Sequence, residues 1–184
     1  MHFQQKFIQS LYLLRFSHKN IFTYNVHFVL CPILVGKTEK DYYVKAVDEY
    51  SKRVSRYCKF EIKVIPELKN TKSMSVDVQL QKEAECILPL IQGVQEVILL
   101  DENGLEFNSV EFSKFIEKRM IGGQRDLFFV VGGPYGFSDK VKSTANAKIS
   151  LSKFTFSHQL VRLVFLEQLY RAFTIIKGEP YHHQ

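Results

Sequence analysis

The sequence has few cysteines, and their spacing excludes two kinds of site. Cys31, Cys58 and Cys86 lie far apart and form no CxxC pair, so neither a structural zinc site nor a disulfide framework is expected. Free thiols fit a reducing cytoplasm, which is the expected location. The six histidines are scattered as well, and His182 and His183 are adjacent. That is poor geometry for a shared ion, and we expect no metal.

Low-complexity tracts and internal repeats are also absent, which excludes a disordered chain and a solenoid. The longest apolar run of the first 25 residues, Leu11 to Leu14, is far too short to span a membrane. This aromatic, basic and acid-free stretch fits a transit peptide, a non-native upstream start or a tail. We therefore predict that residues 1–25 are an N-terminal extension outside the fold, and that residues 26–184 form a single domain.

What the chain does contain suits a folded domain. Its 184 residues are 46% hydrophobic and 24% charged, which is enough to build a real core. The formal net charge is +6, and residues 140–184 carry seven basic and two acidic residues. A basic C-terminal quarter fits a polyanionic partner. On charge alone, a solvated face without a ligand is the simpler interpretation.

Strand and helix patterns alternate along the chain, which predicts an α/β domain with a mostly parallel sheet. The expected strands cover residues 26–35, 60–64, 96–101, 126–131 and 147–151. The expected helices cover residues 39–57, 76–91, a stretch capped by Asn108, 138–144 and 158–176. The first strand is expected to be buried, although Pro32 could end or kink it, and Asn103-Gly104 is expected to form a turn. Ligands of such sheets bind beyond the carboxyl ends of the strands, which directs attention to residues 100–104, 132–136 and 151–156.

Two of these loops could hold a ligand. Gly132–Gly136 would allow close approach to the backbone, or would simply form a tight turn. Its pattern is not GxGxxG, and no ribose-binding acid follows at the expected distance, so a dinucleotide-binding fold is disfavoured. In the loop 151–158, the hydroxyls of Ser152, Thr155 and Ser157 could cap the last helix. Alternatively, the backbone of that loop could hold an adenine edge.

The last helix is apolar around almost its whole circumference, which predicts burial on all sides and therefore a partner subunit. A tail, Gly178-Glu-Pro-Tyr-His-His-Gln184, follows it. A structural tail would more often be charged and simple. The tyrosine and histidine rings here can form hydrogen bonds, and histidine can hold or accept a proton near neutral pH.

Six stretches, in this order, resemble the bacterial RlmH-type family, the ribosomal RNA pseudouridine N3-methyltransferases of the SPOUT class. The matching stretches are Val97-Ile-Leu-Leu-Asp101, Phe129-Val-Val-Gly-Gly-Pro-Tyr-Gly-Phe137, Leu151-Ser-Lys-Phe-Thr-Phe156, His158-Gln159, Glu167-Gln-Leu-Tyr-Arg-Ala172 and Gly178-Glu-Pro-Tyr-His182. The resemblance extends from about Val26 to the C-terminus. The N-terminal extension departs from it, and so does Ser157, where many relatives carry proline.

The resemblance implies a SPOUT-type α/β knot, with a C-terminal trefoil knot, in an obligate homodimer. It implies methylation of N3 of a pseudouridine in 23S ribosomal RNA, with S-adenosyl-L-methionine bound in the knot. The implied cofactor-binding residues are Leu100, Gly132, Leu151, Ser152, Lys153, Phe154, Thr155 and Phe156. Because no separate RNA-binding domain is present, the expected substrate is the assembled ribosome.

The candidate catalytic residues are Arg171, Tyr181, His182 and His158. The guanidinium of Arg171 could hold the target base or a phosphate, or could be a buried structural group near the dimer interface. Tyr181 and His182 are expected to contact the nucleotide, because exposed RNA bases commonly stack on such rings. His158 is expected to orient its loop rather than take the proton. Lys153 could also serve the phosphate backbone.

Three other functions stay open on the sequence. The chain could be a SPOUT methyltransferase of another RNA site, in tRNA or elsewhere in ribosomal RNA. It could be a non-catalytic ribosome- or RNA-binding module, which would need the basic C-terminal quarter but not the glycine loop. It could also be a nucleotide-binding regulatory domain without methyl transfer.

Overall fold

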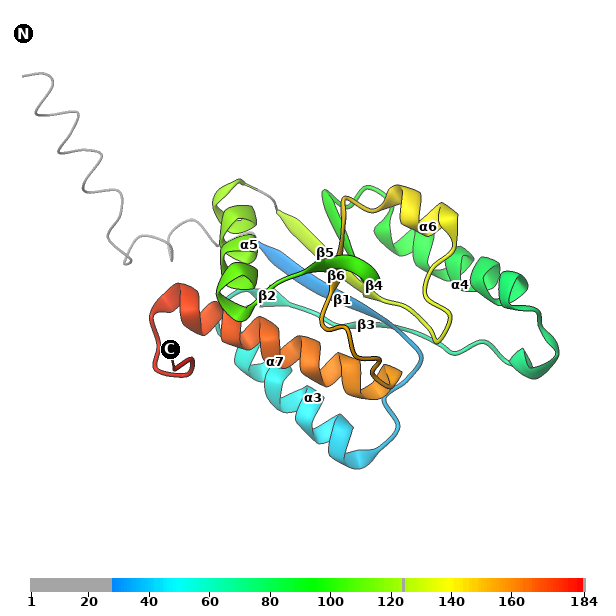
Figure 1. Ribbon diagram of the computed structural model, residues 1–184, viewed down its shortest axis with the longest axis horizontal. Helices are drawn as coiled ribbons and strands as arrows, with labels where there is room; N and C mark the ends of the chain where they lie inside the picture. The colour runs from blue at the N-terminus through cyan, green and yellow to red at the C-terminus, as the bar shows by residue number, and fades with distance from the viewer. Residues whose placement is uncertain (1–27, 124, 184) are drawn as a thin grey trace, which may run out of the picture.

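The computed structural model describes residues 28–123 and 125–183, so Val26 and the predicted N-terminal extension lie outside the described residues. Strands and helices alternate as predicted (Figure 1). In chain order they are β1 (Val29–Val35), α3 (Asp41–Val54), β2 (Lys59–Phe60), β3 (Lys63–Ile65), the 3₁₀ helix η2 (Thr71–Ser73), α4 (Val76–Ile91), β4 (Glu96–Glu106), α5 (Ser109–Ile121), β5 (Asp126–Val131), α6 (Asp139–Thr144), β6 (Ala147–Ser150) and α7 (His158–Lys177).

The strands form one sheet in the order β2-β1-β5-β4-β6, with β3 pairing β1 beside β2. Every strand pairing among the described residues is parallel, which confirms the predicted sheet type. The central strands β4 and β5 are buried over Val97–Leu99 and Leu127–Val131. Continuous apolar runs suit strands that are covered on both faces. Parallel order also brings the ends of β4, β5 and β6 to one edge of the sheet.

Pro32 lies inside β1 and pairs with Phe129, so the expectation that it ends this strand is wrong. Pro32 instead interrupts the hydrogen bonding on the side of β1 that faces β2 and β3. The carbonyl of Leu30 accepts a hydrogen bond from the Glu61 amide (3.2 Å), so Leu30 and, two residues on, Pro32 face β2 and β3. Because proline has no N–H, the ladder is interrupted there. The single strand predicted over residues 60–64 is accordingly split into β2 and β3.

The predicted turn at Asn103-Gly104 is also wrong in form. β4 continues to Glu106, and both Leu100 and Leu105 pair with Ile149, so residues 101–104 project as a bulge. Within the bulge, the Asn103 amide donates to Asp101 Oδ1 (2.9 Å). A Cβ at Gly104 would lie 2.5 Å from the Ile149 backbone. Gly104 is therefore required by close approach of β6, rather than by a hairpin turn.

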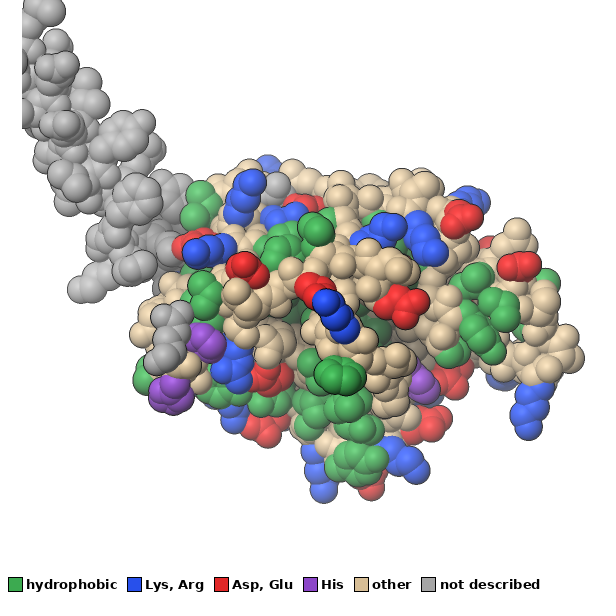
Figure 2. All heavy atoms as spheres, viewed as in Figure 1, with side chains coloured by type: hydrophobic (Ala, Val, Ile, Leu, Met, Phe, Trp, Pro, Cys, Tyr) green, Lys and Arg blue, Asp and Glu red, His purple; other side chains and the backbone are tan. Residues whose placement is uncertain are grey.

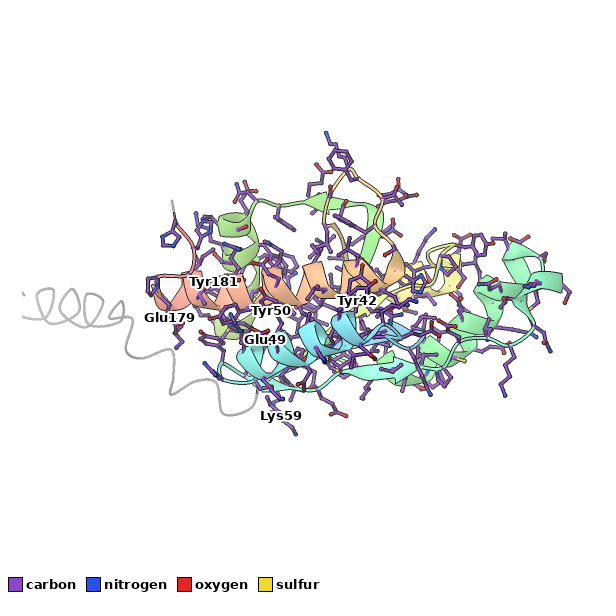
Figure 3. The ribbon with its side chains drawn as sticks, turned by 90° about the horizontal axis from the view of Figure 1, so that it is seen from below. Tyr42, Glu49, Tyr50, Lys59, Glu179 and Tyr181 are labelled. Carbon is purple, nitrogen blue, oxygen red and sulfur yellow. The ribbon has the colours of Figure 1, made fainter. Side chains whose placement is uncertain are left out.

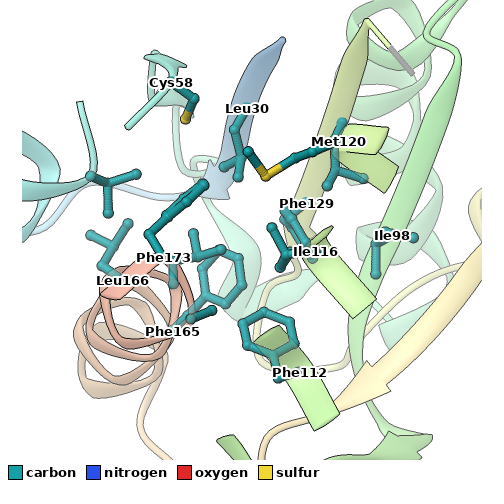
Figure 4. Close-up of a cluster of buried hydrophobic side chains, with 14 of the residues drawn as sticks. Leu30, Cys58, Ile98, Phe112, Ile116, Met120, Phe129, Phe165, Leu166 and Phe173 are labelled. Carbon is teal, nitrogen blue, oxygen red and sulfur yellow. The ribbon is translucent and has the colours of Figure 1, made fainter. Parts of the chain in front are cut away.

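Two layers of helices cover the sheet. Helices α3, α5 and α7 lie on one face, and α4 and α6 lie on the other (Figure 1). The core between the sheet and helices α3, α5 and α7 is rich in aromatic rings, and the ring centroids of Phe129 and Phe165 lie 4.8 Å apart (Figure 4). The predicted cap of α5 at Asn108 is confirmed, and it is a capping box in which the Asn108 and Glu111 side chains each accept a hydrogen bond from the other residue's backbone amide. These cores fix the helices relative to the strand ends.

Helix α7 buries one side in a single chain. Phe165, Leu169 and Phe173 are fully buried, whereas Leu160 and Val164 near its start are only half-buried. The apolar circumference read from the sequence is thus divided between the core and the molecular surface. The predicted burial on all sides would need a further partner.

Two of the three cysteine thiols are buried, one in each hydrophobic core. Cys58 lies with α7 and Cys31 with α4, while Cys86 is exposed. Burial raises the pKa of Cys58 to about 12 and that of Cys31 to about 11. Because the thiolate is the reactive form, we expect alkylation at about pH 8 to modify Cys86 alone until the protein is denatured.

Mass spectrometry of the intact chain measures this pattern. The free energy of unfolding should also fall as the pH rises above the ordinary thiol range, because the folded state disfavours both buried thiolates. Rapid modification of Cys58 in the native protein would contradict the packing described here.

Candidate active site

A cavity of ≈ 620 Å³ lies at the carboxyl ends of β4, β5 and β6. Three loops and the start of α7 line it, which is the position expected for a ligand of a parallel sheet. All of the residues predicted to bind a cofactor are in its lining. They are Leu100, Gly132, Leu151, Ser152, Lys153, Phe154, Thr155 and Phe156. The structure therefore brings together segments that are separated by about fifty residues of sequence.

The glycine loop after β5 is a tight turn. The Gly136 amide donates to the Gly133 carbonyl (3.1 Å), and Gly136 has a φ of 76°, a conformation that favours glycine. A Cβ at Gly132 would lie 2.9 Å from the Gly136 carbonyl oxygen and 3.0 Å from the Phe137 ring. The turn interpretation is correct, and the turn also forms a wall of the cavity.

The loop between β6 and α7 is held by its own hydroxyls. Ser152 Oγ accepts a hydrogen bond from the Phe154 amide (2.9 Å), and Ser150 Oγ donates to the Ser152 carbonyl (3.0 Å). Of the predicted caps, Ser157 caps α7 by accepting from the Leu160 amide (3.3 Å). The serine that departs from the family pattern thus has a structural use.

Three charged lining residues were not named as site residues from the sequence, although two of them lie in the strand-end segment 100–104 that the sequence indicated. Asp101 and Glu102 enter the lining from the bulge of β4, and Lys142 does so from α6. Two acids and a second lysine therefore join Lys153, His158 and the glycine, hydroxyl and apolar groups that line the cavity. Only the bulge, which no local pattern indicated, brings those acids to the cavity.

The start of α7 is tied to the segment after β1. Gln159 Oε1 accepts from the Glu39 amide (3.1 Å). Arg162 is 1% exposed and donates to the Val35 carbonyl (2.6 Å) and to Thr38 Oγ1 (3.1 Å). A buried guanidinium is stable only with such partners. These bonds fix the helix end at which His158 lines the cavity.

The other candidate catalytic residues gather at the far end of α7. Arg171 forms an ion pair with Glu167, and its guanidinium lies over the Tyr181 ring at 4.8 Å from the centroid. Its Nη1 is 3.4 Å from His182 Nδ1. The hydrogen bond and charge of Glu167 raise the pKa of Arg171. The three residues of the tail cluster, Arg171, Tyr181 and His182, are thus in contact with one another.

Helix α3 supports this tail cluster, which the sequence did not indicate (Figure 3). The hydroxyls of Tyr50 and Tyr181 lie 3.2 Å apart, and Tyr181 also donates to Glu167 Oε1 (3.2 Å). Tyr57 donates to Glu179 Oε2 (2.5 Å). Burial, together with the bond to Tyr50, raises the pKa of Tyr181, which therefore stays neutral and can donate. The sequence placed Tyr50 only within the expected helix 39–57, and its hydroxyl gave no separate signal.

In one chain, the cavity and the tail cluster lie far apart. His158 and Arg171 stand on the same helix, and the helical rise separates them by about 20 Å. In the view of Figure 2, histidine side chains are visible at two well-separated places on the molecular surface. His158 joins the cavity, while Arg171, Tyr181 and His182 do not line it.

In residues 28–123 and 125–183, no helix is long and apolar enough to cross a membrane. The same residues contain no group of three or more His, Cys, Asp or Glu side chains arranged to hold a metal ion.

The parallel sheet with a cavity at its carboxyl edge defines the class, an α/β protein whose strand-end loops form a cavity of ligand size. The family described as predicted SPOUT methyltransferase matches residues 30–182, and the chain belongs to that family. It is thus a SPOUT methyltransferase, an enzyme that takes its methyl group from S-adenosylmethionine.

Bacterial relatives cover most of this chain. A protein of Christiangramia forsetii, named ribosomal RNA large subunit methyltransferase H, is 54% identical over 83% of this chain and 97% of its own length. Proteins of the same name from Parabacteroides distasonis and Bacteroides thetaiotaomicron are 52% and 51% identical over the same shares. A solved tRNA-modifying TrmH/SpoU enzyme of A. aeolicus is 10% identical, with a TM-score of 0.44 over 94% of this chain and 91% of that chain. That likeness is too distant to add to the family assignment.

We expect the hydroxyl of Tyr50 to hold the tail in place. Tyr50→Phe removes one hydrogen bond to Tyr181 and should speed hydrogen exchange in residues 179–182 about fivefold, the effect of losing about 1 kcal/mol locally. Tyr42→Phe is the matched control, because Tyr42 is on the same helix and 63% exposed (Figure 3). Exchange that is equal in the two variants would show that Tyr50 does not hold the tail.

Proposed function

We propose that this enzyme methylates N3 of a pseudouridine in 23S ribosomal RNA, acting as a homodimer on the assembled ribosome in the bacterial cytoplasm. The observation that carries the proposal is the gathering of all eight expected cofactor residues around one cavity. The names of the relatives, which are about 50% identical, supply the substrate class. The basic C-terminal quarter is compatible with binding to an RNA backbone.

The cavity fits S-adenosylmethionine in size and chemistry. A volume of ≈ 620 Å³ is in the range of cofactor sites. Gly132 allows close approach, and the loop 151–156 offers backbone groups for an adenine edge. The cofactor supplies an electrophilic methyl group on a positively charged sulfur. Asp101 and Glu102 could offset the positive charge of the sulfonium, in a lining that also contains Lys142 and Lys153.

The separation of the cavity from the tail cluster supports a homodimer. A single chain has both parts of the expected site at opposite ends of α7, and a second copy of the chain could bring its tail to the cavity of the first. Exposed apolar side chains suit such a contact, with Phe154 83% and Val44 43% exposed. Figure 2 shows hydrophobic side chains gathered at the lower centre of the view, where Figure 1 places α3 and the start of α7. Most monomers expose only small apolar patches. The proposal also includes the C-terminal trefoil knot that the resemblance to the family implies.

The tail cluster has the chemistry that the nucleophile requires. N3 of a pseudouridine must lose its proton before it attacks, and the cationic Arg171 would favour the resulting anion or hold a phosphate. Neutral Tyr181 can donate a hydrogen bond, and His182 is a candidate proton acceptor. We propose that His158 orients the cofactor loop and that Lys153 reaches the RNA backbone. Most of the rate would come from the alignment of the two reactants.

The direct test is mass spectrometry of ribosomal RNA nucleosides after ribosomes are incubated with the enzyme and labelled S-adenosylmethionine. A labelled N3-methylpseudouridine is the expected product. A labelled tRNA nucleoside, or equal activity on short naked RNA, would favour a methyltransferase of another RNA site.

Shortening the chain after Gly178 should abolish methylation and leave cofactor affinity within a few-fold, because the tail lies away from the cavity of its own chain. His182→Ala should lower turnover strongly, whereas His183→Ala, at an exposed neighbour, should not. Turnover measurements and calorimetry with S-adenosylmethionine provide the two readouts. Normal turnover of the shortened chain would remove the tail from the mechanism.

Gly132→Leu should abolish methylation and leave RNA binding unchanged, because a side chain there meets the Gly136 carbonyl. Unchanged methylation would show that Gly132 does not shape the methyl-transfer site, whereas RNA binding without any methylation by the wild-type chain would favour a non-catalytic module. If each site combines the cavity of one chain with the tail of another, co-expression of this variant with the shortened chain should restore about a quarter of wild-type activity. The absence of any recovery in isolated mixed dimers would contradict the shared site.

A further inference from the structure

Glu83 is a buried carboxylate that has no place in the function proposed above. It lies on α4, is 5% exposed, and is not part of the cavity lining. Gln79, one turn earlier, donates to Glu83 Oε1 (3.3 Å). Burial raises the pKa of Glu83, while hydrogen bonds with Gln79 and with the Gly133 backbone act in the opposite direction. A buried carboxylate is costly unless such donors satisfy it.

The carboxylate of Glu83 lies directly against the glycine loop. A Cβ at Gly133 would be 2.6 Å from Glu83 Oε1 and 2.7 Å from Oε2, and its nearest neighbours all belong to Glu83. Gly133 is not among the glycines with positive φ, so its backbone conformation would accept alanine. A side chain at position 133 would therefore have to displace the buried carboxylate of Glu83.

The neighbouring Gly132 is glycine for a different reason. A Cβ there would meet the Gly136 carbonyl oxygen at 2.9 Å and the Phe137 ring at 3.0 Å, which belong to the loop and its continuation. Removing Glu83 would not relieve those contacts. The two glycines thus offer a matched pair, in which only one depends on the carboxylate.

We propose that Glu83 is a positioning residue of the cofactor site, which holds the glycine loop from behind through Gly133. The inference rests on the proposed function, in which this cavity binds S-adenosylmethionine. Gly132, Gly133 and Gly136 line the cavity, so a displacement of the loop at Gly133 changes the shape of the wall. A hydrogen bond to a carboxylate is among the stronger and better defined in proteins, which suits this task.

The test is a double-mutant cycle measured as affinity for S-adenosylhomocysteine. Gly133→Ala should weaken binding at least about tenfold, as expected when a carboxylate contact is broken. In the Glu83→Ala background, the same Gly133→Ala change should cost about twofold or less, because the clash is gone. Gly132→Ala should be equally damaging in both backgrounds.

A second pair of variants keeps side-chain volume constant. Glu83→Gln leaves one acceptor oxygen for two donors, and we expect binding to weaken several-fold with little change in the melting temperature of the ligand-free protein. Glu85→Gln, at an exposed position on the same helix, should leave both unchanged. Glu83 variants that lower the melting temperature but bind normally would show a purely structural role and overturn the inference.

The outcomes separate this inference from the proposed function. Normal wild-type binding with an equal cost of Gly133→Ala in both backgrounds would overturn the inference alone. A wild-type chain that does not bind S-adenosylhomocysteine would overturn both.

Discussion

The burial of helix α7 against the sheet is the interaction on which both parts of the site depend. Phe165, Leu169 and Phe173 are fully buried on its inner side, and each contributes about 1.5–3 kcal/mol by leaving water. The helix is 20 residues long and its rise is fixed, so it spans about 30 Å. One end of α7 therefore lines the cavity, while the other carries the tail cluster beyond the reach of that cavity.

Each part of the site is held by polar contacts from another element. At the start of α7, Arg162 bonds to the segment after β1. At the end of α7, Glu167 accepts hydrogen bonds from both Arg171 and Tyr181. Groups that are held in place before the substrate arrives lose little freedom on binding, which is the main requirement for bringing two reactants together. Such positioning suits a methyltransferase that acts by alignment.

Local patterns predicted the elements well where burial was continuous. The apolar runs of β4 and β5 and the capping box at Asn108 are all found in the structure. The errors arose where tertiary contacts override local preference. Pro32 stays inside β1 because its missing N–H faces an interruption of the ladder. Asn103-Gly104 becomes a bulge because β6 pairs on both sides of it.

The sequence by itself determined the alternation of strands and helices, the three strand-end loops of the cavity, and the family, because local periodicity and ordered motifs are properties of neighbouring residues. Only the tertiary structure decided that Glu83 supports Gly133, that Tyr50 meets Tyr181 across 131 positions, and that cavity and tail cluster lie apart. Contacts between distant segments follow from how the helices pack on the sheet, and no short stretch of the sequence carries a signal of that packing.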